Sequence, residues 1–319
     1  MLLWRGLGWL GRQASPAIAI GVFAGLLVPP LASLMKPLLI PAIVLPFLVA
    51  LLRLDWLRLR DYASEPGRAA LQLFWLLLAL PVIVDLALRP LALPPGIHAA
   101  MVLMGAAPPL MASGSLALIL GLDAALAVFM TVLATALMPF TLPTVALHLL
   151  GVEVGVGLGE LMLRLGLLVA GCFLVAWLLR RILPPGFPAR HADALDGLAV
   201  VGLLSFAIAI MDGVTWLLLD DPAFVLLCAL AAFGLNLGLQ ALGALAFAWR
   251  GRQRALTLGL ISGNANLGML VAALADRANF ELFVFVAVAQ FPIYTLPAVQ
   301  RPLYRRLLNG RGRDTGGSE

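Results

Sequence analysis

Long apolar runs, separated by short polar or proline-rich connections, occupy almost the whole chain. Most of the runs are long enough to cross about 30 Å of hydrocarbon as a helix that rises about 1.5 Å per residue. The pattern predicts ten membrane-spanning helices, at residues 14–32, 37–54, 68–89, 96–122, 123–149, 158–183, 195–219, 222–249, 254–276 and 279–303. Segments with strict apolar and polar alternation, typical of transmembrane barrels, do not occur in the sequence. The predicted fold is therefore an all-α integral membrane protein.

The composition agrees with this interpretation. Of the 319 residues, 62% are hydrophobic and 12% are charged, and the mean hydropathy is +1.04. Soluble domains carry about 25% charged residues, so the composition excludes a soluble globular domain. The first stretch, residues 1–12, has only a short apolar patch, and we expect it to be a retained interfacial segment rather than a signal peptide.

The distribution of basic residues predicts the orientation in the membrane. If the amino terminus is cytoplasmic, four of the 21 Lys and Arg residues fall on the outer side: Lys36, Arg89, Arg164 and Arg277. Cytoplasmic connections are enriched in Lys and Arg, so we expect both termini in the cytoplasm and a multi-pass protein of the cell inner membrane. The net charge of +5 then reflects topology, and no nucleic-acid partner is expected.

The two halves of the chain contain a weak internal repeat. Asp123 and Pro139 recur 153 positions later as Asp276 and Pro292. Each half contains five predicted helices, and because five is odd, the second half must enter the membrane from the opposite face. The predicted organisation is a first five-helix repeat, a second, inverted five-helix repeat and a disordered basic cytoplasmic tail, at residues 1–150, 151–305 and 306–319.

Two of the predicted helices contain polar interruptions. In the fourth, Pro108 and Pro109 lack the backbone N–H that a helix interior needs, and residues 113–115 read Ser-Gly-Ser. In the ninth, the matching residues 264–268 read Asn-Ala-Asn-Leu-Gly. An unpaired backbone group in hydrocarbon costs several kcal/mol, so such a break is stable only inside the protein or beside a wet cavity. We expect two discontinuous helices, although a kink that only allows close packing is the alternative for the first break taken alone.

Matching breaks in two inverted repeats are a sequence feature of transporter binding sites. We therefore expect the fourth and ninth helices to cross near the membrane midplane and to bind a substrate there. Backbone N–H groups at the starts of the half-helices favour a negative group, so the predicted substrate is a small organic anion. The candidate substrate-binding residues are Ser113, Gly114, Ser115, Thr131, Gly263, Asn264 and Asn266.

The first break and the helix after it contain short motifs. Residues 107–114 read Ala-Pro-Pro-Leu-Met-Ala-Ser-Gly, residues 122–123 read Leu-Asp, and residues 130–131 read Met-Thr. Together with two five-helix halves, these motifs resemble the bile acid:sodium symporter family, part of a wider group with arsenite and auxin-carrier relatives. The family's corresponding motifs are Cys-Pro-Gly-Gly-Thr-Ala-Ser-Asn, Gly-Asp and Met-Thr. The resemblance implies a secondary transporter whose broken helices cross at the substrate site, and it implies coupling to sodium.

The positions that the resemblance assigns to two sodium sites are only partly kept. Ser113 and Thr131 retain their hydroxyl groups. The family's other side-chain ligands, one of them a carboxylate, are replaced here at Gly114, Ala127, Ile261 and Ala265. A buried cation needs its hydration shell replaced and its charge offset. We therefore expect that sodium does not drive this protein; a sodium-coupled symporter with a rearranged site that includes Asn264 is the alternative.

Ionisable residues inside membrane segments are functional candidates by default. Asp212 is predicted to lie inside its helix, where a single carboxylate could carry a proton for coupling. Asp85 lies four residues before Arg89, so an i,i+4 ion pair explains it. Asp123 and Asp276 each begin a helix and are predicted helix caps. Polar residues on apolar helices predict interhelical hydrogen bonds at Asn236, Gln240 and Gln290.

The sequence therefore predicts a secondary transporter that moves a small organic solute through the lipid bilayer by alternating access. No cofactor is expected, because the sodium sites are incomplete and a proton on Asp212 is the other candidate for coupling. An enzyme is not expected, since the sequence has no Ser/His/Asp grouping, metal-ligand set or phosphate-binding loop. A non-transporting membrane sensor or assembly module with eroded sites is the alternative function, and the oligomeric state is left open.

Overall fold

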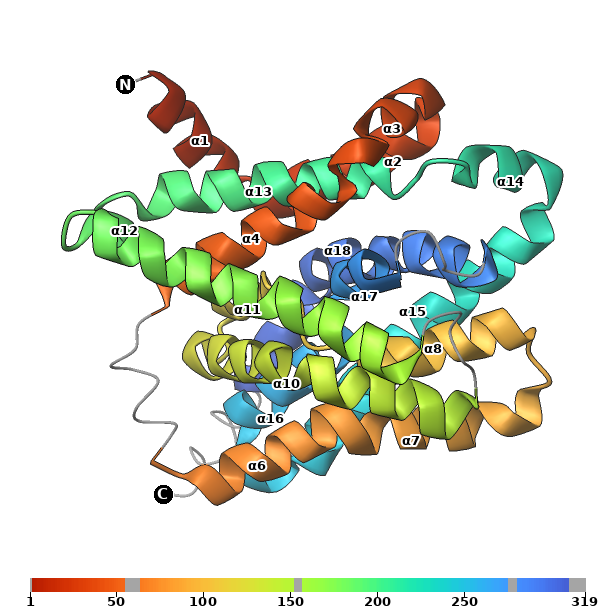
Figure 1. Cartoon of the computed structure of the whole chain (residues 1–319). Helices are drawn as coiled ribbons and strands as arrows, with labels where there is room; N and C mark the ends of the chain where they lie inside the picture. The colour runs from red at the N-terminus through yellow and green to blue at the C-terminus, as the bar shows by residue number, and fades with distance from the viewer. Residues whose placement is uncertain (1, 55–63, 152–156, 275–279, 310–319) are drawn as a thin grey trace, which may run out of the picture.

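The computed structural model describes residues 2–54, 64–151, 157–274 and 280–309. Within these residues every regular element is a helix, apart from one isolated β-bridge (Figure 1). The main helices are α1 (Leu2–Arg12), α2 (Ala14–Leu27), α3 (Pro29–Met35), α4 (Leu39–Arg53), α6 (Pro66–Phe74), α7 (Leu80–Leu88), α8 (Pro95–Ala106), α9 (Ser113–Leu120), α10 (Ala124–Leu150), α11 (Leu158–Ile182), α12 (Phe187–Arg190), α13 (Ala192–Ala209), α14 (Val214–Asp220), α15 (Pro222–Ala246), α16 (Arg252–Gly263), α17 (Leu267–Leu274) and α18 (Phe280–Asn309). Residues 306–309 of the predicted tail are the end of α18. The rest of that tail and Asp276 lie outside the described residues.

In the described part, seven helical stretches are long and apolar enough to cross a membrane, or up to eight when the bent pair α1–α2 counts as one span. They are Pro29–Arg53, Pro66–Leu91, Ala124–Leu150, Leu158–Ile182, Ala192–Asp220, Pro222–Ala246 and Phe280–Asn309. The fourth and ninth predicted segments are not among them, because α8 and α16 have 12 residues each and α9 and α17 have 8 each. A multi-pass helical membrane protein is confirmed, whereas the ten-helix inverted repeat stays a prediction.

One group of helices packs around α13. Helices α1, α2 and α4 all contact α13, and the backbones approach closely at glycines. Gly197 lies so close to Leu7 of α1 that a Cβ there would overlap the Leu7 carbonyl group. A Cβ at Gly202 would lie 2.7 Å from Cδ of Pro46 in α4. Small residues are common between membrane helices because close van der Waals packing, rather than a hydrophobic difference from lipid, holds the helices together.

A second group contains both broken helices. Helix α15 packs against α16 and α18, and α10 packs against α8, α9 and α16. Helix α11 contacts α4 of the first group and α10 of the second, and α18 contacts both α2 and α8. In Figure 1, α13 and α4 accordingly lie on one side of the molecule, and α6, α7, α10 and α16 lie on the other. The boundary between the two groups therefore runs along α11 and α18.

Ion pairs connect α13 to its neighbours near its amino-terminal end. Arg12 of α1 lies 3.1 Å from the carboxylate of Asp193. Arg53, the last residue of α4, pairs with Asp196 one turn further along α13. These charged groups lie at helix ends and stay partly exposed to water, so the cost of removing them from water is small and each ion pair is also weak. The glycine contacts therefore determine how closely α1 and α4 pack on α13, and the ion pairs add a weaker contribution at the helix ends.

Asp212 does not lie inside a continuous helix, and this corrects the sequence-based expectation. A turn at residues 210–213 separates α13 from α14. Gly213 in this turn has a φ of +82°, a left-handed conformation that glycine adopts without steric cost. The half-buried Asp212 accepts hydrogen bonds from Ser33 Oγ at 2.5 Å and from Lys36 Nζ at 2.8 Å. Its carboxylate is therefore paired with a cation at a helix break.

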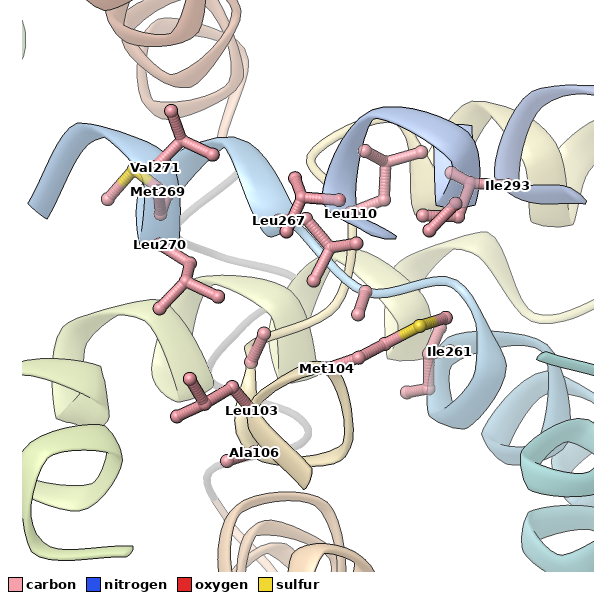
Figure 2. Close-up of a cluster of buried hydrophobic side chains, with 14 of the residues drawn as sticks. Leu103, Met104, Ala106, Leu110, Ile261, Leu267, Met269, Leu270, Val271 and Ile293 are labelled. Carbon is pink, nitrogen blue, oxygen red and sulfur yellow. The ribbon is translucent and has the colours of Figure 1, made fainter. Parts of the chain in front are cut away.

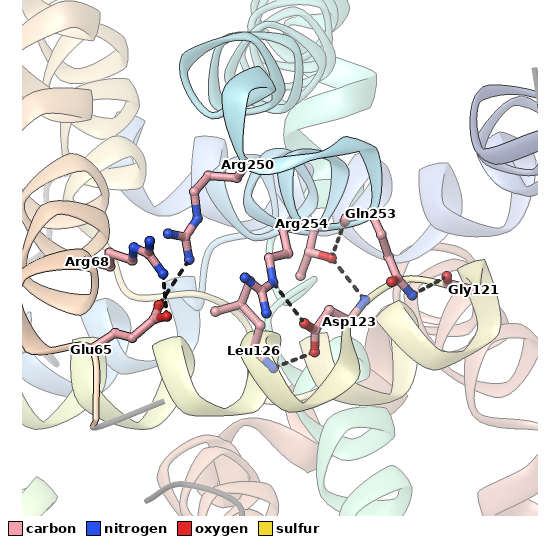
Figure 3. A network of polar contacts seen from close by, with 9 residues as sticks. Glu65, Arg68, Gly121, Asp123, Leu126, Arg250, Gln253 and Arg254 are labelled. Carbon is pink, nitrogen blue, oxygen red and sulfur yellow. Dashed lines mark hydrogen bonds and ion pairs between the residues drawn. The ribbon is translucent and has the colours of Figure 1, made fainter. Parts of the chain in front are cut away.

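Polar contacts connect the start of α16 to the turn between α9 and α10 (Figure 3). The backbone N–H of Leu126 donates to Asp123 Oδ1 at 3.0 Å, which confirms the predicted helix cap. The backbone N–H of Asp123 donates to Thr257 Oγ1 at 3.0 Å, and its other carboxylate oxygen lies 4.0 Å from Arg254 Nε. The turn that follows α9 is thus held to the start of α16.

The contact between α1 and α13 generates a stability prediction. Replacing Gly197 by Ala should lower the melting temperature of the detergent-purified protein, because the new methyl group meets the backbone of Leu7. Overpacking of this kind costs about 1–3 kcal/mol, more than the roughly 1 kcal/mol that Ala gains over Gly in a helix. Gly171→Ala is the matched control, since a Cβ at this position in α11 has no neighbour within 4 Å. Equal melting temperatures for the two variants would contradict the close contact.

Candidate functional site

The two breaks lie against each other and are joined by backbone hydrogen bonds. The backbone N–H of Leu110 donates to the carbonyl of Asn264 at 2.8 Å, and the N–H of Asn266 donates to the carbonyl of Pro108 at 2.7 Å. Between these bonds, Pro109 faces Ala265 in an antiparallel β-bridge. The structure thus confirms that both helices are discontinuous, and it brings the two breaks together.

These hydrogen bonds explain why the breaks are stable in an apolar environment. Pro108 and Pro109 have no N–H to donate, so the first break must find its backbone partners outside its own helix. The second break accepts one hydrogen bond from the first break, at the carbonyl of Asn264, and donates one to it, from the N–H of Asn266. Because an unpaired backbone group in hydrocarbon costs several kcal/mol, neither break is stable without the other.

The paired breaks, residues 108–110 and 264–266, are called the crossing below. The predicted site residues that lie in or beside them along the chain are Ser113, Gly114, Gly263, Asn264 and Asn266. Ser113, Asn264 and Asn266 are buried, with 0%, 0% and 6% of their surface exposed. The hydroxyl oxygen of Ser113 is buried and has no hydrogen-bond partner among the described residues. Thr131 is also buried, and its hydroxyl donates to the carbonyl of Ala127 in its own helix at 2.8 Å. Ser113 thus keeps an unused hydrogen-bonding group inside the protein, whereas the hydroxyl of Thr131 is already bonded.

The glycines and the second serine of the predicted site have different environments. Gly263 packs directly against the backbone of Asn236, and Gly114 packs against the side chain of Val128. A larger residue would not fit at either position. Ser115, in contrast, is exposed and lies on the outer side of α9. The crossing therefore includes the backbone at Gly114 and Gly263 but does not include the side chain of Ser115.

A chain of hydrogen-bonded amide and hydroxyl groups from α15 and α18 supports the second break. Asn236 Nδ2 donates to the carbonyl of Gly263 at 2.7 Å and lies 3.5 Å from Asn264 Oδ1. Gln240 Nε2 donates to Asn236 Oδ1 at 2.7 Å, and Tyr304 OH donates to Gln240 Oε1 at 2.8 Å. The interhelical bonds predicted for Asn236 and Gln240 are confirmed. Sequence reasoning missed Tyr304, because it lies just beyond the predicted end of its helix at residue 303.

Trp75 also contacts the second broken helix, near the end of α15. It begins a π-helical turn, η2 (Trp75–Ala79), before Pro81, whose missing N–H disturbs the regular hydrogen-bond pattern. The indole Nε1 donates to Ser262 Oγ at 3.2 Å, and the ring packs edge-on against Phe247 with 5.8 Å between the centroids. Ser262 therefore has Trp75 as a partner, and this contact adds to those that α15 makes with α16.

Apolar side chains fill much of the space around the crossing (Figure 2). Ile261 is 2% exposed, and Figure 2 shows the side chain of Met104 extending toward it. Ala127 and Ala265 are also buried, with 0% and 2% of their surface exposed. In the described residues, no group of three or more His, Cys, Asp or Glu side chains could hold a metal ion. Three of the positions that the resemblance assigns to sodium ligands, Ala127, Ile261 and Ala265, are thus occupied by packed aliphatic groups.

A small cavity of about 10 Å³ lies beside the crossing. Pro46 of α4 and Leu203 of α13 line one side of it, and Asn266, Gln290 and Tyr294 line the other. A cavity of this size has room for about one water molecule. The two helix groups therefore leave only this small cavity between them beside the crossing.

The other ionisable candidates lie in separate contacts. Asp85 accepts a hydrogen bond from Arg89 Nη2 at 2.7 Å, which confirms the predicted i,i+4 ion pair. Asp85 also lies 2.9 Å from His98 Nε2, in the first turns of α8. Asp212 is paired with Lys36, as described above. Gln290 Nε2 donates to the carbonyl of Val286 in its own helix at 2.8 Å, so this bond is not the interhelical one that the sequence predicted.

Comparison with known families agrees with this architecture. The model of the Sodium Bile acid symporter family matches residues 37–220, more than half of the 319 residues. The chain belongs to this family. The matched residues include the first break and Thr131 and end before the second break. No curated protein matches the chain. Members of the sodium bile acid symporter family are transporters rather than enzymes, and the chain is a multi-pass membrane protein of this transporter family.

The amide chain behind the second break generates a prediction. Asn236→Leu keeps the side-chain volume but leaves the carbonyl of Gly263 and the amide of Gln240 without this partner. Each unsatisfied buried group costs about 1–3 kcal/mol, so the melting temperature in detergent should fall by several degrees. Leu237→Ala, at an exposed position of the same helix, is the control and should change it little. An unchanged melting temperature for Asn236→Leu would show that the second break does not depend on this support.

Proposed function

We propose that this protein is a secondary transporter that carries a small organic anion across the membrane by alternating access. The observation that supports the proposal most strongly is the backbone pairing of the two broken helices. Paired helix breaks in transporters place the ends of half-helices beside a central binding site. Membership in the sodium bile acid symporter family supports the same function class.

The proposed site consists of Ser113, Gly114, Thr131, Gly263, Asn264 and Asn266. Helices α9 and α17 both begin at the crossing, at Ser113 and Leu267. The N-terminal end of a helix carries free N–H groups and a partial positive charge, which favours an anionic group. No residue between positions 105 and 122 or between 255 and 274 is charged. No carboxylate within these two stretches therefore competes with an anionic ligand for the N–H groups. An anion is therefore favoured over a cation at the crossing.

Movement between the two helix groups would expose this site alternately to the two sides of the membrane. The closed contact of Pro46 and Leu203 with Asn266 and Gln290 supports this mechanism, since the boundary between the groups passes beside the crossing. We further propose that the two halves are inverted repeats and that both termini are cytoplasmic. A non-transporting sensor or assembly module is the alternative, and transport measurements distinguish the two.

For coupling, we propose that sodium is not the driving ion. The burial of Ile261 and Ala127 in an apolar cluster supports this proposal, because neither offers an oxygen ligand. A proton on Asp212 is the second candidate. Its 2.8 Å contact with Lys36 stabilises the charged carboxylate, so proton binding would have to release Lys36.

The transport proposal is tested by uptake into proteoliposomes, with a labelled conjugated bile acid as the first organic anion. Asn266→Leu should reduce uptake at least tenfold while the protein remains folded, because the side chain lines the closed cavity at the crossing. Thr141→Val on α10, which removes a hydroxyl bonded to its own helix, should retain uptake. Uptake by Asn266→Leu at the normal rate would place the site elsewhere. Binding without uptake by the unmodified protein would favour the sensor alternative.

The sodium proposal is tested separately. Uptake and thermal stability should be the same in sodium as in choline at fixed pH and ionic strength, because two hydroxyls and main-chain carbonyls do not compensate a buried cation. Ser113→Ala should then change substrate affinity without changing any response to sodium. A saturable stabilisation by sodium that disappears in Ser113→Ala would instead demonstrate a rearranged sodium site.

A further inference from the structure

A second, larger cavity lies far from the crossing along the chain, between α1, α12 and the start of α13. Its volume is about 560 Å³, within the range of pockets that hold small ligands. The lining includes Trp4, Arg5 and Arg12 from α1 and Arg190, His191 and Asp193 from the other wall. The proposed transport function uses none of these residues.

The charge of this cavity favours an anion. Three arginines line it, against one carboxylate, Asp193. Arg12 pairs with that carboxylate at 3.1 Å, and Arg190 donates to the carbonyl of Pro185 at 2.5 Å, which leaves other N–H groups of both guanidinium groups available. Arg5 is exposed and forms no ion pair among the described residues. A guanidinium fork of this kind matches the geometry of a phosphate group.

Aromatic rings form one wall of the cavity. The ring centroid of Trp4 lies 5.0 Å from that of His191 and 6.3 Å from that of Phe187. Phe187 and His191 are stacked at 4.2 Å. Trp side chains concentrate at the level of lipid headgroups, where one side of the ring is apolar and the other is wet. The wall is therefore suited to the glycerol and upper acyl region of a lipid beside its phosphate.

The direction of α1 places the cavity at a membrane surface. Helix α1 is bent by 89° from α2, so it lies across the direction of the spanning helices (Figure 1). It is amphipathic: its glycine face contacts α13, whereas Trp9 is 60% exposed on another face. Amphipathic helices with basic and Trp residues lie in the plane of the membrane interface. This geometry supports the interfacial segment predicted from the sequence.

We propose that the cavity between α1, α12 and α13 binds the phosphate of an anionic phospholipid through Arg5 and Arg190, with Trp4 against the lipid. A lipid is favoured over a soluble phosphate because the exposed Trp9 holds α1 at the interface, where the cytoplasmic leaflet supplies anionic headgroups. The bound lipid connects α1 to the end of α12, and through α1 to α13, so it stabilises the helix group that moves against the crossing.

The test uses the full-length protein in detergent and measures its melting temperature during titration with phosphatidylglycerol. Phosphatidylcholine with the same acyl chains and inorganic phosphate are the comparison probes. Phosphatidylglycerol should stabilise the protein at lower concentration than phosphatidylcholine. Arg5→Gln should raise the half-saturating concentration of phosphatidylglycerol about fivefold, as expected for about 1 kcal/mol per basic residue near an anionic surface. Arg5→Gln combined with Arg190→Gln should raise it about 25-fold.

Arg306→Gln is the matched control, since Arg306 is an exposed arginine at the end of α18 and does not line the cavity. It should leave the half-saturating concentration within about twofold of the unmodified value. If the double variant fails to fold because Arg190 supports Pro185, the single variant Arg5→Gln decides the question. Equal effects of the two lipids, an equal loss in Arg306→Gln, or stabilisation by inorganic phosphate alone would each overturn the proposal. None of these readouts depends on transport.

Discussion

The backbone hydrogen bonds between the two helix breaks are the constraint on which the rest of the structure depends. They join Leu110 to Asn264 and Asn266 to Pro108, across more than 150 positions of sequence. In an apolar environment these groups have few alternative partners, so the two broken helices must be held in one register. The packing of α10 and α15 around α16, the cap at Asp123 and the amide chain to Tyr304 all serve to maintain that register.

The support around the breaks is asymmetric, and this has a physical cause. The first break is shaped by Pro108 and Pro109, whose rings restrict φ and remove two backbone donors. The second break contains no proline and depends on side-chain hydrogen bonds from Asn236 and on the contact of Trp75 with Ser262. Buried polar groups that are fully paired specify one arrangement, whereas a half-paired network is unstable. The second break is therefore the more sensitive of the two to substitution.

The sequence was sufficient to predict the breaks, because proline pairs and polar runs inside apolar segments have few structural explanations. The cap at Asp123 and the pair of Asp85 with Arg89 were equally predictable, since both follow from spacing along one helix. What spacing does not determine is which face of a helix meets which neighbour. For that reason the exposure of Ser115, the pairing of Asp212 with Lys36 and the contact of Gly197 with Leu7 required the structure.

The absence of charged residues in the sequence around both breaks also limits how the site can discriminate between ligands. Neutral amides, hydroxyls and helix N-termini attract an anion without holding it as tightly as a buried arginine would. A carrier must release its ligand on the opposite side, so moderate affinity at the crossing is compatible with turnover. The cavity at α1 has the opposite character, because three arginines with permanent charges line it. On the two proposals made above, the charged cavity is suited to retaining a ligand, whereas the uncharged crossing is suited to releasing one.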